Sequence, residues 1–126
     1  MDLAEERLLV AMTRDNAVWR LPIMADGTVS KVGRFVQLSG GIAGPDGMAL
    51  DAEGGLWVAD AGHGSVWGFS ALGVPTVRIT APAGLVTTNV AFGGEDNRTA
   101  WITLSGTGKL ARMPWPRPGL TLAHNA

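Results

Sequence analysis

The residues best suited to chemistry in this chain are those of Pro45-Asp46-Gly47, which lead directly into the apolar run Met48–Leu50. A carboxylate between a proline and a glycine sits on a constrained loop at the mouth of a strand. Loops on a rigid sheet scaffold commonly carry catalytic and binding residues, and a carboxylate there suits a metal ligand or a general base. The same three residues also favour a turn for backbone reasons alone. A plain turn is therefore the alternative interpretation.

An internal repeat surrounds Asp46. The run Leu56–Ala59, followed by Val66-Trp67, matches Leu8–Ala11, followed by Val18-Trp19, at a constant offset of 48 residues. Both halves of the match hold without a gap. The repeated unit is therefore a strand, a polar loop and a second strand.

A third copy of the repeat follows. Val90–Phe92 corresponds to Met48–Leu50, and Ala100–Thr103 corresponds to Leu56–Ala59. Repeats of about 40–50 residues built from short strands are typical of β-propeller blades, four-stranded sheets that bury their faces only against their neighbours. The sequence predicts an all-β fold, a partial propeller of about three four-stranded antiparallel blades. The expected blades cover approximately residues 1–43, 44–86 and 87–126.

Composition supports an all-β chain. Its 18 Gly and 7 Pro fall between apolar runs, and no segment shows a sustained helical period with caps. The expected strand cores are Leu8–Met12, Val18–Leu21, Met48–Leu50, Leu56–Ala59, Val66–Phe69, Val77–Ile79, Val90–Phe92 and Ala100–Thr103. Four tryptophans lie inside them: Trp19, Trp57, Trp67 and Trp101. We expect these rings to pack between blades rather than to form a ligand cage.

Several classes of function have no support in the sequence. The chain has no cysteine, which excludes disulfides, thiolate zinc sites and a cysteine nucleophile. A net charge of −1 without a basic stripe predicts no nucleic-acid or anionic-membrane partner. No apolar run approaches the roughly 20 residues of a membrane-spanning helix. The first residues do not form a signal peptide, so a cytoplasmic location is the default expectation.

The familiar catalytic motifs are also missing. Ser105–Lys109 resembles a phosphate loop only superficially, because the first glycine is misplaced and Leu110 stands where a Ser or Thr is needed. His63 and His124 have no evident carboxylate partner. We expect both histidines to be solvated residues without a catalytic role.

Two separate motifs resemble one family. Pro45–Ala59, and Thr87–Gly94 followed by Arg98–Thr103, are similar to the family of gluconolactonase and regucalcin (senescence marker protein). The upstream run Leu9–Arg20 looks like that family's preceding blade. The resemblance implies a six-bladed propeller with one divalent metal ion in its central channel. It also implies lactone hydrolysis, or calcium binding with lactonase activity.

The resemblance assigns a role to one residue of this chain, and position in the next blade suggests two more. Family members bind the metal through a Glu near the chain start, an Asn on a middle blade and the Asp of the Pro-Asp-Gly motif. Only the last maps here, onto Asp46, as metal ligand and catalytic base. Thr88 holds the equivalent place in the next blade and Asn89 follows it, so both are candidates for lining the channel; a capping turn is the alternative. Calcium is the expected ion, with zinc, magnesium or manganese as alternatives, and this chain liganding it incompletely.

The chain resembles the C-terminal half of a family member. We therefore expect a small-molecule lactone as substrate, and either the missing N-terminal half or a second copy to close the ring. The isolated chain should be inactive. The alternative is a non-catalytic propeller fragment that acts as a binding or scaffold module. The sequence encoded upstream of Met1 would discriminate between the two.

The half-ring leads to a first prediction. Three blades expose apolar faces that a full ring would cover, and exposed faces and edges of this kind drive association. We expect the isolated chain to self-associate or to be poorly soluble, as measured by light scattering. A cooperatively folding monomer at all concentrations would contradict this expectation.

Overall fold

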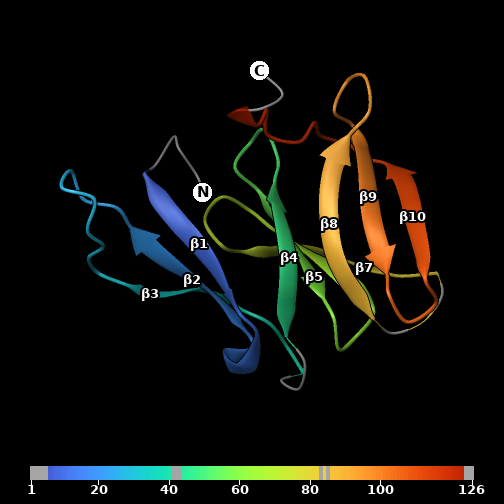
Figure 1. Ribbon diagram of the computed structural model, residues 1–126, viewed down its shortest axis with the longest axis horizontal. Helices are drawn as coiled ribbons and strands as arrows, with labels where there is room; N and C mark the ends of the chain where they lie inside the picture. The colour runs from blue at the N-terminus through green and yellow to red at the C-terminus, as the bar shows by residue number, and fades with distance from the viewer. Residues whose placement is uncertain (1–5, 41–43, 83, 85, 124–126) are drawn as a thin grey trace.

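Figure 1 shows the computed structural model of the protein, which describes residues 6–40, 44–82, 84 and 86–123. Within these residues ten strands form three antiparallel sheets, and a short 3-10 turn, η1 (Thr13–Asp15), joins the first two strands. The first sheet contains β1 (Arg7–Met12), β2 (Ala17–Pro22) and β3 (Gly33–Gln37). The second contains β4 (Pro45–Leu50), β5 (Leu56–Asp60), β6 (Ser65–Phe69) and β7 (Pro75–Thr80). The third contains β8 (Thr87–Gly93), β9 (Thr99–Leu104) and β10 (Lys109–Pro114).

The all-β, antiparallel prediction is confirmed. Each sheet is a meander in which successive strands pair in chain order. The described residues include no helix with the length and apolar character needed to cross a membrane.

The first and third sheets each lack a different one of the four strands found in the second sheet. By the 48-residue repeat, β1 and β2 correspond to β5 and β6, and β3 pairs with β2 as β7 pairs with β6. The first sheet therefore has no described counterpart of β4. The third sheet begins with β8, the counterpart of β4, and has no described counterpart of β7. The prediction of four strands therefore holds for the middle sheet, whereas the outer two have three strands each among the described residues.

Two of the ten strands were not predicted. In β3 only Phe35 and Val36 are apolar, and they are adjacent rather than alternating. In β10, Lys109 and Leu110 are both exposed, and only the alternating pair Ala111 and Met113 packs against the core. Backbone pairing with β2 and β9 holds these strands in their sheets, and side-chain patterns do not report such pairing.

The core consists of two apolar clusters, each between adjacent sheets. The cluster between the second and third sheets contains Trp57, Val66, Val90, Ala100, Ile102, Leu104 and Trp115. The cluster between the first and second sheets contains Val18, Val36, Leu38, Leu56, Val58 and Phe69. Trp57 meets Trp115 edge-on, with ring centroids 4.6 Å apart. This confirms that Trp57 packs between blades.

The segment after β10 returns across the molecule to the second sheet (Figure 1). We call residues 115–120 the C-terminal strap. Its Gly119 N–H donates to Asn97 in the third sheet's first turn, and its Leu120 N–H donates to Leu50 at the end of β4. The strap therefore joins the second and third sheets through backbone hydrogen bonds.

A glycine beside Trp57 provides a stability prediction. A Cβ built on Gly68 would lie 2.7 Å from Trp57 Cη2, and the buried indole has no room to turn away. We expect Gly68→Ala to lower the free energy of unfolding by about 1–3 kcal/mol, the usual cost of overpacking a core. Urea unfolding measures this change.

Gly33→Ala is the matched control, because Gly33 is also a strand glycine but its added Cβ would meet nothing within 4 Å. Its change should stay within about 0.5 kcal/mol. Equal urea midpoints for the two variants would contradict the packing described for Trp57.

Candidate functional site

Asp46 lies in a β-bulge at the start of β4. Pro45 pairs with Asp60 and Met48 pairs with Val58, so three steps along β4 are matched by two along β5. The extra residue falls at Asp46-Gly47. A bulge interrupts the ladder locally and redirects a side chain, which is why bulges often lie beside active sites. Asp46 itself is exposed to solvent.

The next inner strand has a bulge in the corresponding place. Thr87 pairs with Leu104 and Asn89 pairs with Thr103, which leaves Thr88 as the extra residue of β8. Because β4 and β8 lie side by side and run in the same direction, the two bulges lie at the same end of the inner strands (Figure 1). Asp46 and Thr88 therefore occupy corresponding positions.

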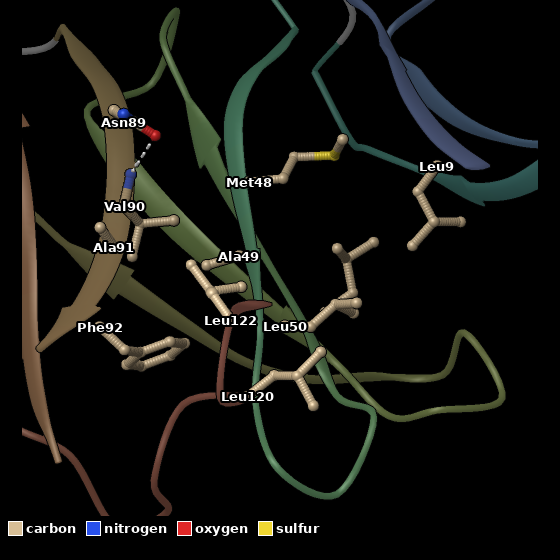
Figure 2. Close-up of a pocket in the computed structure, with 11 residues that line it drawn as sticks. Leu9, Met48, Ala49, Leu50, Asn89, Val90, Ala91, Phe92, Leu120 and Leu122 are labelled. Carbon is tan, nitrogen blue, oxygen red and sulfur yellow. Dashed lines mark hydrogen bonds between the residues drawn. The ribbon is translucent and has the colours of Figure 1, made fainter. Parts of the chain in front are cut away.

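Asn89 contacts the strand that carries Asp46. A Cβ built on Gly47 would lie 2.7 Å from Asn89 Cα and still closer to the amide oxygen of the side chain. Only a glycine therefore allows the two strands to approach this closely at the bulge. The Asn89 side chain is exposed, and its Oδ1 accepts a hydrogen bond of 2.9 Å from the Val90 N–H (Figure 2). The structure thus brings Asn89 next to the residue that follows Asp46.

Thr88 has a different environment. It is half-buried, and its Oγ1 lies 2.8 Å from Thr103 Oγ1 on β9. Its hydroxyl is therefore engaged within its own sheet. The assigned roles of Asp46, Thr88 and Asn89 stay predictions.

Two threonine hydroxyl groups hold the start of both inner strands. Thr13 Oγ1 donates to the Pro45 carbonyl at 2.8 Å, which ties η1 to the first residue of β4. Thr87 Oγ1 contacts two carbonyl oxygens of the second sheet, Asp60 at 3.0 Å and Ser65 at 2.8 Å. Sequence reasoning missed these residues, because a lone threonine does not indicate a partner dozens of residues away.

His63 has a carboxylate partner. Its Nδ1 lies 3.0 Å from Oδ2 of Asp60, and Trp67 Nε1 donates to the same oxygen at 3.1 Å. Asp60 is only 1% exposed, so these donors take the place of water at its side-chain oxygens. The prediction that His63 has no carboxylate partner is therefore wrong, although its side chain keeps 32% of its surface exposed in the turn. The spacing of three residues across a tight turn was the missed signal. His124 lies outside the described residues.

The carboxylate of Asp15 is also engaged in hydrogen bonds. Asp15 belongs to η1 and accepts two hydrogen bonds from the Arg34 guanidinium and one from Trp19 Nε1. Hydrogen bonding to Arg34 and then to Trp19 lowers the pKa of the Asp15 carboxyl below its usual value. Asp15 is therefore ionised but already paired.

The described residues do not make a complete metal centre. Asp46 and Asn89 offer carboxylate and amide oxygens, which are the ligand types that calcium and magnesium prefer. Calcium takes about 6–8 oxygens, however. Nowhere in the described ranges do three or more His, Cys, Asp or Glu side chains gather as such a site would need. The donors fit a hard cation in type but not in number.

A hollow of about 300 Å³ opens across the inner strands. It extends from Asn89 at one end to the segment after β10 at the other (Figure 2). Its lining is almost entirely apolar: Leu9, Met48, Ala49, Leu50, Leu56, Val90, Ala91, Phe92, Leu120 and Leu122 join Asn89. The candidate site thus combines polar residues at the bulges with an apolar wall along the strands.

Three sheets set side by side, each with its first strand innermost where that strand is described, define part of a β-propeller. The chain belongs to the SMP-30/gluconolactonase family, since residues 2–106 match the region described as SMP-30/Gluconolactonase/LRE-like. The 6-deoxy-6-sulfogluconolactonase of Pseudomonas putida is 36% identical over 116 residues, covering 88% of this chain and 39% of that relative.

Two solved structures share the fold. A protein described as a candidate gluconolactonase superposes with a TM-score of 0.77 at 29% identity, over 90% of this chain and 37% of its own. The calcium-binding protein regucalcin of Agrobacterium tumefaciens superposes with a TM-score of 0.68 at 32% identity, over 78% of this chain and 34% of its own. The prediction of a partial propeller is confirmed. The chain spans less than two fifths of each of these proteins.

The two hydroxyls at the start of β8 provide a matched pair of substitutions. Thr87→Val keeps the shape of the side chain but removes the buried hydroxyl that contacts the carbonyl oxygens of Asp60 and Ser65. We expect it to lower the free energy of unfolding by about 1–3 kcal/mol. Thr88→Val removes one half-buried hydrogen bond and should cost less than about 1 kcal/mol. Urea unfolding compares the two, and a Thr88 variant that is the less stable of the pair would contradict the geometry.

Proposed function

We propose that this chain is the C-terminal half of a propeller that hydrolyses a sugar-type or related lactone, with Asp46 as a catalytic residue. The observation that carries the proposal is the position of Asp46, exposed in a bulge at the end of an inner strand and next to the contact with Asn89. Membership of the gluconolactonase family supports the substrate class, as does the name of the Pseudomonas relative.

Lactone hydrolysis needs a group that accepts and donates protons. Water adds to the carbonyl carbon of the lactone and gives up a proton. The bond between that carbon and the ring oxygen then breaks, and the ring oxygen takes up a proton to become a hydroxyl group. The exposed carboxylate of Asp46 is suited to accept the proton from water and to donate a proton to the ring oxygen. The amide group of Asn89 suits a hydrogen bond to the substrate, because its oxygen is already held by Val90 N–H and its nitrogen remains a donor.

A divalent cation is part of the proposal, with calcium preferred because the regucalcin neighbour is a calcium-binding protein. Asp46 would hold it with one carboxylate oxygen, and the remaining ligands would come from the N-terminal half of the ring. When bound, such an ion polarises a carbonyl or lowers the pKa of bound water. The isolated chain should therefore bind the ion weakly and hydrolyse lactones slowly or not at all.

Substitution of Asp46 in a completed ring tests the proposal. This chain is fused behind the N-terminal blades of a family member, and lactone hydrolysis is followed by acid release with and without added calcium. We expect Asp46→Ala to lower kcat/KM by at least about 100-fold, the lower range for removal of a general base.

Asp96→Ala is the matched control. Asp96 is exposed in the turn between β8 and β9, at the far end of the inner strand, and its Oδ1 only caps the Arg98 N–H. The lactonase activity of the ring with Asp96→Ala should equal that of the parent ring. Full activity in the Asp46→Ala ring would overturn the assignment of Asp46, whereas a parent ring without lactonase activity would favour a non-catalytic binding module.

A further inference from the structure

We propose that His63 is a substrate-binding residue of this site, and that its Nε2 forms a hydrogen bond with a hydroxyl group on the part of the lactone away from the carbonyl. The substrate is then a lactone that carries hydroxyl groups rather than an unsubstituted alkyl lactone. Buried Asp60 is the positioning residue for the imidazole. The inference rests on the proposed function, because it takes the lactone as the ligand of the site.

The turn between β5 and β6 carries His63 to the rim where both bulges lie. Asp60, at the end of β5, pairs with Pro45, the residue before Asp46. On its other side, the Asp60 carbonyl oxygen contacts Thr87 Oγ1 at the start of β8, at 3.0 Å. Figure 1 shows this turn at the same end of the sheets as the starts of β4 and β8. The imidazole therefore belongs to the same end of the molecule as the candidate site.

A buried carboxylate fixes the orientation of the imidazole. His63 Nδ1 lies 3.0 Å from Oδ2 of Asp60 and 3.2 Å from Oδ1. An ionised carboxylate only accepts hydrogen bonds, so Nδ1 carries the proton of the neutral ring and Nε2 is left as an acceptor. The ester group of a lactone has no hydrogen to donate. The group that Nε2 binds on such a substrate is therefore a hydroxyl group.

The Nε2 atom of His63 is open to a ligand. In the described part of the chain, the side-chain hydrogen bonds of His63 are all made by Nδ1. The described side-chain atoms that are both buried and unpartnered are Asn16 Oδ1 and Trp115 Nε1. Because Nε2 is not among these atoms, it is unpartnered and reaches solvent.

Gly40 keeps this edge of the ring uncovered. Its φ is +93°, and a Cβ built on it would lie 2.5 Å from both Cε1 and Nε2 of His63. Real Cβ atoms essentially never lie so close to another atom. A residue with a side chain at position 40 would therefore displace the imidazole or cover its Nε2.

The internal repeat shows that the imidazole is not needed to anchor its neighbouring indole. In the first sheet, Asp15 stands 48 residues before His63 and itself accepts a hydrogen bond from Trp19 Nε1. In the second sheet, Asp60 accepts the equivalent hydrogen bond from Trp67 Nε1. The sheet that carries the candidate site thus holds its indole with Asp60 and has an imidazole in addition.

Substrate selectivity in the completed ring tests the inference. Hydrolysis of glucono-1,5-lactone, which carries hydroxyl groups, is compared with hydrolysis of δ-valerolactone, which has the same ring without them. We expect His63→Ala to lower kcat/KM for the hydroxylated lactone at least about 5-fold more than for δ-valerolactone, the effect of one lost hydrogen bond. Equal losses for the two lactones, or no loss for either, would overturn the inference.

A pair of glycine substitutions tests the same edge of the ring while keeping the imidazole. Gly40→Ala places a Cβ against Nε2 and should reproduce the loss of selectivity. Gly27→Ala is the matched control, because Gly27 also has a positive φ, +84°, but its added Cβ would meet nothing within 4 Å. The control should keep the selectivity of the parent. Equal selectivity in the two variants would contradict the accessibility of Nε2.

The positioning role of Asp60 is measured on the chain itself. Nitrogen-15 chemical shifts of the neutral His63 ring should show the proton on Nδ1, and Asp60→Asn should weaken this preference because an amide group also donates hydrogen bonds. A parent ring with its proton on Nε2 would overturn the inference, whether or not the Asp60 variant folds.

A binding measurement separates failure of the inference from failure of the proposed function. If the parent ring hydrolyses neither lactone, the proposed function fails. Gluconate, which carries hydroxyl groups, and valerate, which carries none, are then titrated into the ring while the NMR signal of His63 Cε1–H is followed. The same titration decides the inference if δ-valerolactone is too poor a substrate to compare. A saturable shift with gluconate alone supports His63 as a hydroxyl-binding residue, and no shift, or equal shifts with both acids, overturns it.

Discussion

The second and third sheets meet around the indole of Trp57. Its ring packs edge-on against Trp115, and its N–H donates to Asp51, a carboxylate with no exposed surface, at 2.9 Å. The same carboxylate accepts the Gly55 N–H and so fixes the turn between β4 and β5. A buried acceptor that loses its donors costs more than the hydrogen bonds contribute when made. The pairing of β4 with β5, and with it the bulge at Asp46, therefore depends on this buried contact.

The bulges show how a repeated scaffold makes a site from unlike residues. Equivalent backbone irregularities in β4 and β8 place different side chains, Asp46 and Thr88, at the same level of adjacent strands. The backbone geometry is common to both sheets, so a change of chemistry needs only a change of side chain. Gly47 limits this freedom, because the close approach of Asn89 leaves no space for a Cβ.

The sequence predicted the parts of the fold that repeat. Strands such as β5 and β6 have strong apolar runs on the 48-residue spacing, and Asp46 stands in a turn motif directly before such a run. It did not predict β3 and β10, because their places in the sheets depend on backbone pairing. Nor did it predict the contact between His63 and Asp60, since a turn must close before the two side chains meet. Local patterns report which residues are apolar, but not which polar groups a folded chain brings together.

The C-terminal strap affects the order in which the chain can fold during synthesis. Gly119 forms an isolated β-bridge with Asp51, and the Leu120 N–H donates a hydrogen bond to the Leu50 carbonyl. These contacts at the end of β4 join residues about 70 positions apart in the sequence. The second sheet leaves the ribosome well before its last partners do. Until the C-terminal strap emerges, the end of β4 has backbone groups without these partners, and such unpaired groups favour association with other chains. The chain is therefore most exposed to mispairing in the interval between synthesis of β7 and synthesis of the C-terminal strap.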